Sequence, residues 1–160
     1  MNREDVPSRD RVAAVLVLLY AQPLTRIVRL TTDDILHEDG EVLVRLGDPP
    51  SPVPEPFAGL MLAYLNERPN TMTATNPAAR WLFPGRRAGQ PMTSKTLELR
   101  LRRLGFPTQR GRTAAIRHLV LQAPAPVIAR MLGYHDDTTA QLAAESGGTW
   151  RHYAPGDHSR

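Results

Sequence analysis

The chain has 160 residues, a formal net charge of +4 at pH 7 and no cysteine. This length suits one domain with a substantial core, and the lack of cysteine excludes disulfide scaffolds and thiolate metal sites. The first residues carry mixed charges, which excludes a secretory signal. The longest apolar run, Val12–Ala21, is too short to span a bilayer. We expect a soluble, cytoplasmic, single-domain protein in which residues 147–160 form a polar tail.

The charges are unevenly distributed along the chain. Lys95 is the only lysine, so nearly all cationic side chains are arginines. Residues 1–85 carry a net charge of −3, residues 86–117 carry +8, and residues 118–160 carry −1. A strongly basic block within a slightly acidic chain indicates a polyanion-binding surface. A merely solvated cationic face is the alternative.

The first 46 residues predict a buried helix, a short helix and a hairpin. The first helix is expected to start at Pro7-Ser8 and to lie centrally, because its run to Ala21 is apolar on nearly all sides. Pro23 ends it, and Thr25 is the predicted N-cap of a short second helix. Asp39-Gly40 stands between alternating stretches, which predicts a hairpin. Its strands are placed near Ile35–His37 and Val42–Leu46.

The middle of the chain predicts a proline-rich connector followed by two helices. Five of the fifteen prolines lie in Gly47–Pro56, which is interpreted as a rigid connector within one domain. An amphipathic helix follows from Pro56. The stretch "WLFPG" is predicted to be a short buried strand. Thr93 or Ser94 is expected to open the next helix, and Gly105 to close it.

The last part of the chain predicts three more helices. They occupy "TAAIRHLVLQ", "VIARMLG" and "TTAQLAAES". The last two resemble a helix-turn-helix, in which Thr138 opens the second helix. Packing of two short helices without DNA contact is the alternative. The second helix has no Lys or Arg and contains Glu145, which argues against base contacts in the major groove. The predicted fold class is therefore mainly α with a small antiparallel β-sheet.

The stretch "GRTAAIRHLVLQAP" places Arg112, Arg117 and His118 within an apolar helix. Such residues cap a helix, pair with acids, or bind the phosphates of a nucleic acid. If Arg117 has a purely structural role, the expected arrangement is a buried ion pair with Asp10 or Asp34. Trp150 and Tyr153 have an equally structural alternative, in which they dock the tail on the core.

No metal or cofactor is expected. The candidate metal ligands are concentrated near the C-terminus, and no recognisable spacing links them. They are His135, Asp136, Asp137, His152, Asp157 and His158. The stretch "GRRAG" lacks the pattern of a phosphate-binding loop.

The order of these elements resembles the catalytic domain of the tyrosine recombinases, the phage-integrase family. The resemblance extends from about Arg9 to Tyr153. It is most recognisable in "LFPGRRAGQPMTSKTLELRLRRLGF" and "IRHLV…IARMLGY". It implies an integrase-like catalytic-domain architecture, here without the N-terminal core-binding domain. It also implies metal-free phosphoryl transfer, in which a tyrosine attacks a DNA phosphodiester and fixed cations stabilise the developing charge.

Carried over position by position, the resemblance matches the family's site poorly. Pro23 falls on the first arginine of the family, and Arg45 is the only cation near the position of the hairpin lysine. Ala114 replaces the histidine of the His-x-x-Arg motif, whereas Arg117 keeps its arginine. Tyr134 takes the next histidine position, with His135 one residue later. The nucleophile position falls on Ala143, and the nearest tyrosine beyond it is Tyr153. The resemblance therefore implies a divergent, degenerate member.

Three hypotheses follow, and double-stranded DNA is the partner in the first two. The first is a catalytically impaired DNA-binding domain, forming homo-oligomers on DNA, with phosphate contacts from Lys95, Arg100, Arg103, Arg110, Arg112 and Arg117. The second is an active recombinase with Tyr153 as nucleophile, a phosphate clamp made by Arg117 with Arg112 or Arg26, and His135 or His152 as proton carrier. The third is an interaction domain whose arginine-rich face binds an acidic protein.

Overall fold

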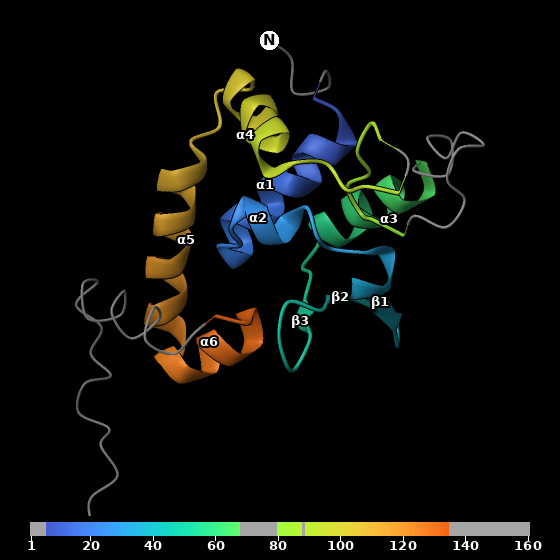
Figure 1. Cartoon of the computed structure of the whole chain (residues 1–160). Coiled ribbons are helices and arrows are strands. Elements are labelled where there is room, and N and C mark those ends of the chain that lie inside the picture. The colour runs from blue at the N-terminus through green and yellow to red at the C-terminus, as the bar shows by residue number, and fades with distance from the viewer. Residues whose placement is uncertain (1–5, 68–79, 88, 135–160) are drawn as a thin grey trace, which may run out of the picture.

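A computed structural model describes residues 6–67, 80–87 and 89–134 of the chain. Helix α1 runs through the middle, and the other helices and a small sheet surround it (Figure 1). The fold class is the predicted one, mainly helical with one three-stranded antiparallel sheet. The helices are α1 Ser8–Tyr20, α2 Leu24–Ile27, α3 Phe57–Glu67, α4 Ser94–Arg103, α5 Thr108–Gln122 and α6 Ala125–Leu132; the strands are β1 Ile35–Glu38, β2 Glu41–Val44 and β3 Ser51–Pro52.

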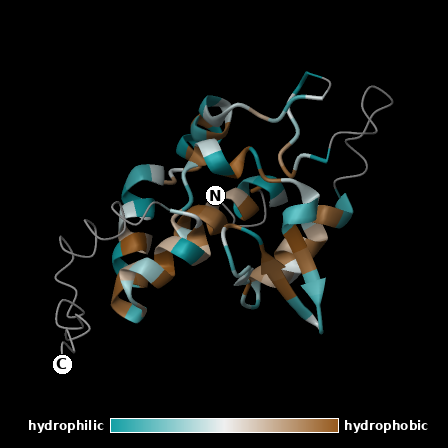
Figure 2. Ribbon diagram, turned by 60° about the horizontal axis from the view of Figure 1, so that its bottom comes forward, coloured by the Kyte–Doolittle hydropathy of each residue, from teal (hydrophilic) through white to brown (hydrophobic). Residues whose placement is uncertain are grey.

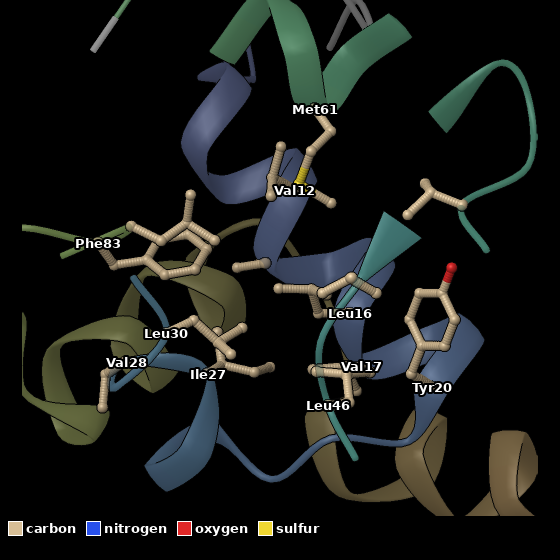
Figure 3. Close-up of a cluster of buried hydrophobic side chains, with 14 of the residues drawn as sticks. Val12, Leu16, Val17, Tyr20, Ile27, Val28, Leu30, Leu46, Met61 and Phe83 are labelled. Carbon is tan, nitrogen blue, oxygen red and sulfur yellow. The ribbon is translucent and has the colours of Figure 1, made fainter. Parts of the chain in front are cut away.

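Helix α1 is the central element of the core. It contacts α2, α3, α4 and α5, as its nearly continuous apolar surface predicts. Its side chains Val12, Leu16 and Val17 are almost fully buried and lie among residues of α2, α3 and the 81–84 segment (Figure 3). Pro7 precedes the helix and Ala21 ends it in the left-handed conformation. The predicted position of this helix is therefore confirmed.

The sheet contains the predicted hairpin and one strand that was not predicted. Asp39 and Gly40 both have positive φ angles, 50° and 82°, which the tight turn between β1 and β2 requires. Apolar residues occupy the base of the hairpin and polar residues its tip (Figure 2). The connector contributes β3, which pairs with β2 at Ser51 and Pro52. Proline is tolerated there because β3 is an edge strand with one neighbour.

The stretch "WLFPG" is buried, but it is not a strand. Leu82 and Phe83 have no exposed surface, and the backbone nitrogen of Leu82 donates to the carbonyl of Leu30. Only isolated bridges form, between Thr31 and Trp81 and between Pro84 and Pro91. The strand prediction is wrong because the prolines at positions 84 and 91 remove the backbone donors of a longer ladder.

The capping predictions for α4 are confirmed, whereas the starts of α2 and α5 differ from the predictions. Thr93 caps α4 by accepting a hydrogen bond from the Thr96 backbone nitrogen at 3.1 Å, and Gly105 follows with a φ of 73°. Helix α2 follows Pro23, so Thr25 lies inside it and is not its cap. Helix α5 begins at Thr108, directly after Pro107, five residues before its predicted start.

Within the described part of the chain, no helix is long and apolar enough to cross a membrane.

Candidate nucleic-acid interface

The basic block 86–117 covers the segment before α4, α4 itself and the first two-thirds of α5. Two of its nine basic residues, Arg100 and Arg112, are half-buried. The other seven are exposed: Arg86, Arg87, Lys95, Arg102, Arg103, Arg110 and Arg117. Most of the charge in the block therefore faces solvent, while the two half-buried arginines form contacts within the protein.

Arg100 forms an ion pair with the buried carboxylate of Asp10. Its Nε and Nη2 donate to Oδ1 and Oδ2 of Asp10 at 2.8 and 2.9 Å, and Asp10 is only 3% exposed. The hydrogen bond to Asp10 raises the pKa of Arg100. The sequence analysis assigned Arg100 to a DNA phosphate. In the structure, two of its three guanidinium nitrogens bind Asp10 and join α4 to α1.

Arg117 is not buried and pairs with neither predicted acid. Asp10 is bound to Arg100, and Asp34 accepts hydrogen bonds from the backbone nitrogen and hydroxyl of Thr31. Arg117 is exposed on α5 and accompanies Arg110 and Ala114 on one face, at spacings of three and four residues. The predicted buried ion pair of Arg117 is wrong, because Arg100 reaches Asp10 from the neighbouring helix.

Arg112 contacts the C-terminal end of α1. Its Nε donates to the carbonyl of Ala21 at 2.9 Å, and its guanidinium carbon lies 5.6 Å from the ring centre of Tyr134. The Tyr134 hydroxyl donates to the same carbonyl. Burial raises the pKa of Tyr134, and the hydrogen bond from Arg112 opposes this shift. A cation is favourable here because helix C-terminal carbonyls carry partial negative charge. Among the three roles open to these cations, Arg112 has that of a helix cap.

Arg26 fulfils the same role at the end of α6. Its Nη1 donates to the carbonyls of Leu132 and Gly133, both at 2.8 Å, and its Nη2 donates to the carbonyl of Leu46 at 2.7 Å. We call this region, where the C-terminal ends of α1 and α6 meet, the α1–α6 junction. It comprises Ala21, Gln22, Arg26, Arg112, Leu132, Gly133 and Tyr134.

The predicted phosphate clamp is not assembled in the structure. Arg112 and Arg117 lie five residues apart on one helix, so their side chains point about 140° apart around its axis. Both terminal nitrogens of Arg26 are bound to carbonyls. In this arrangement, carbonyls at the ends of α1 and α6 bind the two arginines that were predicted to complete the clamp.

Lys95 lies on the exposed side of α4 and lines a small pocket of about 380 Å³ that Arg112 also borders. Several other predicted residues lie outside the described residues. They are His135, His152, Tyr153, Trp150, the second helix of the helix-turn-helix pair and the tail 147–160. Residues 6–67, 80–87 and 89–134 contain no group of three His, Asp or Glu side chains able to hold a metal ion.

A second cationic region lies in an open groove at the other end of α1. It is bounded by the start of α1, by α2, by the 84–93 segment and by α4, and its volume is about 1470 Å³. We call it the arginine groove, after the arginines that line it: Arg9, Arg29, Arg86, Arg87, Arg100 and Arg103.

The sequence prediction missed Arg9 and Arg29 as members of this surface. Both stand outside the basic block, and neither has a local pattern that separates it from other arginines. Packing of α1 and α2 against α4 brings them beside the block.

Comparison with solved structures shows similarity to a recombinase. No protein-family model matches the chain, and no curated protein matches it. A crystal structure of the XerH site-specific recombinase, bound to palindromic difH substrate in a post-cleavage complex, is similar with a TM-score of 0.58 and 18% identity. The fold is that of an integrase-like catalytic domain. The similarity covers 91% of this chain and 44% of the XerH chain.

The integrase-like fold explains the order of the elements that the sequence indicated. At 18% identity the match concerns the fold alone, and the chain spans less than half the length of XerH. The activity of that recombinase is therefore considered for this chain only as a proposal.

Proposed function

We propose that this integrase-like domain binds double-stranded DNA and that its phosphoryl-transfer site is incomplete. The observation that carries the DNA-binding part is the exposure of seven of the nine basic residues between positions 86 and 117. Arginine suits phosphate because its planar fork donates two parallel hydrogen bonds and keeps its charge. That the fold is shared with a recombinase solved on its DNA substrate supports the same proposal.

The incomplete site follows from the residues at the positions that the resemblance assigns to catalysis. Pro23 and Ala114 cannot donate to a phosphate through their side chains. Arg26 and Arg112, the nearest substitutes for the missing arginine, are bound to backbone carbonyls. Loss of one preorganised donor lowers a rate by roughly 10²–10³, and losses within one concerted site are not independent. Arg117 alone is therefore insufficient for recombinase activity.

The test is a fluorescence polarisation titration of the full chain with a labelled duplex. We expect binding that weakens steeply with salt, because each neutralised phosphate releases a counterion. No binding at low salt contradicts the proposal.

A nicked suicide duplex tests whether catalysis persists. We expect no covalent protein–DNA adduct. An adduct that disappears in Tyr153→Phe contradicts the incomplete site and supports the active recombinase instead. Homo-oligomerisation on DNA and a cytoplasmic location stay predictions from the sequence.

A further inference from the structure

We propose that the arginine groove is where this domain holds the phosphate backbone of a DNA duplex, without stacking on its bases. This inference rests on the proposed DNA binding and assigns it to a defined surface. It adds Arg9, Arg29, Arg86 and Arg87 to the residues expected from the sequence, and it leaves the opposite end of α1 outside the interface.

The charge of the groove is largely uncompensated. Among the described residues, six arginines line it, and Glu67 is the only acid that does so. Glu67 lies at one edge and accepts a hydrogen bond from the Ser8 hydroxyl at 2.5 Å. Asp10 neutralises Arg100 beneath the surface. Within the described part of the chain, no acid pairs with the four exposed arginines Arg29, Arg86, Arg87 and Arg103.

The Arg100–Asp10 ion pair also positions the groove. It fixes α4 against the first turn of α1, so that Arg103 on α4 and Arg9 on α1 line the same cavity. Arg9 donates to no acceptor among the described residues, and its Nε lies 3.7 Å from Asp10 Oδ1, too far for a hydrogen bond. Its Nε is buried, which leaves the terminal nitrogens Nη1 and Nη2 as the donors available at the groove wall.

The size of the groove favours a polymer over a small anion. Pockets for small ligands enclose about 300–1000 Å³ and cover most of the ligand, whereas this groove measures about 1470 Å³ and is open to solvent. Its arginines come from four separate segments, so they line a path and not a single point. A chain of phosphates fits such a path.

The lining favours a duplex over a single strand. Single-strand binding relies on exposed aromatic rings that stack with unpaired bases. Among the described residues, the only aromatic side chain that lines the groove is Tyr64, which is 6% exposed. Its hydroxyl donates to the carbonyl of Leu82, and its ring stacks on Phe83. The charged donors of the groove are guanidinium groups, and their contacts with phosphates do not specify sequence.

Two triple variants of equal charge test the inference. Arg29→Gln, Arg87→Gln and Arg103→Gln remove three exposed arginines of the groove. Arg11→Gln, Arg45→Gln and Arg102→Gln remove three exposed arginines outside it. Arg102 and Arg103 are adjacent on α4, so they form the closest matched pair. Circular dichroism and urea unfolding verify that both variants are folded.

We expect the groove variant to lose about tenfold or more of its duplex affinity at 0.1 M salt. The slope of log K against log salt should become shallower by about 2–3, because each lost phosphate contact contributes about 0.9. The control variant should stay within about threefold of the unmodified protein, since long-range effects of exposed charges are screened at this salt. Two duplexes of unrelated sequence should bind alike.

The outcomes separate this inference from the proposed function. If the unmodified protein binds no duplex at low salt, both fail. If it binds duplex but the two triple variants lose affinity equally, the groove assignment fails and DNA binding stands. A single strand that binds more tightly than the duplex overturns the duplex preference. Equal competition by polyglutamate of matched charge shows instead an acidic-protein site.

Discussion

At its first residues α1 borders the arginine groove, whereas its last residues lie in the α1–α6 junction. In the groove, Arg29, Arg86, Arg87 and Arg103 are exposed to solvent. In the junction, Arg26 and Arg112 donate to carbonyls at the ends of α6 and α1. Arginines near the two ends of α1 therefore differ in role: those in the groove face solvent, and those in the junction bind carbonyls of the protein itself.

The contrast shows what decides the role of an arginine in this fold. Two helix C-termini meet at the junction, and their last carbonyls have no partners within their own helices. Arginines that reach these carbonyls are held there. In the described part of the chain, the side chains of the groove arginines Arg29, Arg86, Arg87 and Arg103 donate to no carbonyl, so they stay available to an external anion. The following predictions test this contrast, starting with the largest expected effect.

Arg26→Gln should lower the free energy of unfolding by about 3 kcal/mol. The substitution removes three charge-assisted hydrogen bonds and leaves the partly buried carbonyls of Leu132 and Leu46 without them. Arg29→Gln, on the groove side of the same segment, should change it by less than about 0.5 kcal/mol. Urea unfolding of both variants measures the difference. Equal midpoints for the two variants contradict the structural role of Arg26.

Alkaline pH should destabilise the protein through Tyr20, which is 6% exposed at the junction end of α1. Burial raises the pKa of Tyr20 from 10.0 to about 12. The folded state thus keeps a proton that the unfolded state loses, so stability is complete below pH 10 and falls between pH 10 and 12. The loss should be about 2 kcal/mol. Urea midpoints across this range measure it.

Tyr20→Phe provides the control for the alkaline effect. It removes the hydrogen bond to the Pro52 carbonyl, so the variant should be less stable at pH 7. Its stability should fall less between pH 10 and 12, with a smaller decline left from Tyr134, whose pKa burial also raises. A decline as steep as that of the unmodified protein shows that Tyr20 is not the titrating group.

Tyr134→Phe should lower the free energy of unfolding by about 1 kcal/mol. It removes one of two donors to the Ala21 carbonyl and keeps the ring near the Arg112 guanidinium. Because Arg112 shares that carbonyl, the effects of Tyr134→Phe and Arg112→Gln should not be additive. A double-mutant cycle measures the coupling, and a coupling of zero shows that the two residues act separately.

Arg103→Gln should have the smallest effect on stability, below about 0.5 kcal/mol, since its side chain is exposed. The neighbouring Arg102→Gln should behave alike in unfolding. Only a DNA titration should distinguish the two variants, with the weaker binding for Arg103→Gln. If Arg103→Gln unfolds far more easily than Arg102→Gln, then Arg103 belongs to the folded framework and not to a free cationic surface.

The features that the sequence predicted well are local ones. Asp39-Gly40 specifies a tight turn because both residues accept positive φ angles. Thr93 caps α4 through a contact three residues away. The central position of α1 follows from its own composition.

The features that the sequence prediction missed depend on distant segments. Strand β3 pairs with β2, which no pattern in the proline-rich connector indicates. The Asp10–Arg100 pair joins residues 90 positions apart, and Arg26 reaches carbonyls more than 100 positions away. Sequence spacing cannot identify the partner of Asp10 or of Arg26, because several arginines and several acceptors are chemically equivalent candidates.

The sequence by itself determined the fold class, the hairpin, the central helix and the presence of a basic block, because composition and local periodicity fix these features. Only the tertiary structure decided which arginines of that block remain exposed. It placed Arg112 against the end of α1, bound Arg100 to Asp10, and gathered Arg9 and Arg29 beside Arg86, Arg87 and Arg103. The physical reason is that each guanidinium binds the acceptor that packing brings within reach.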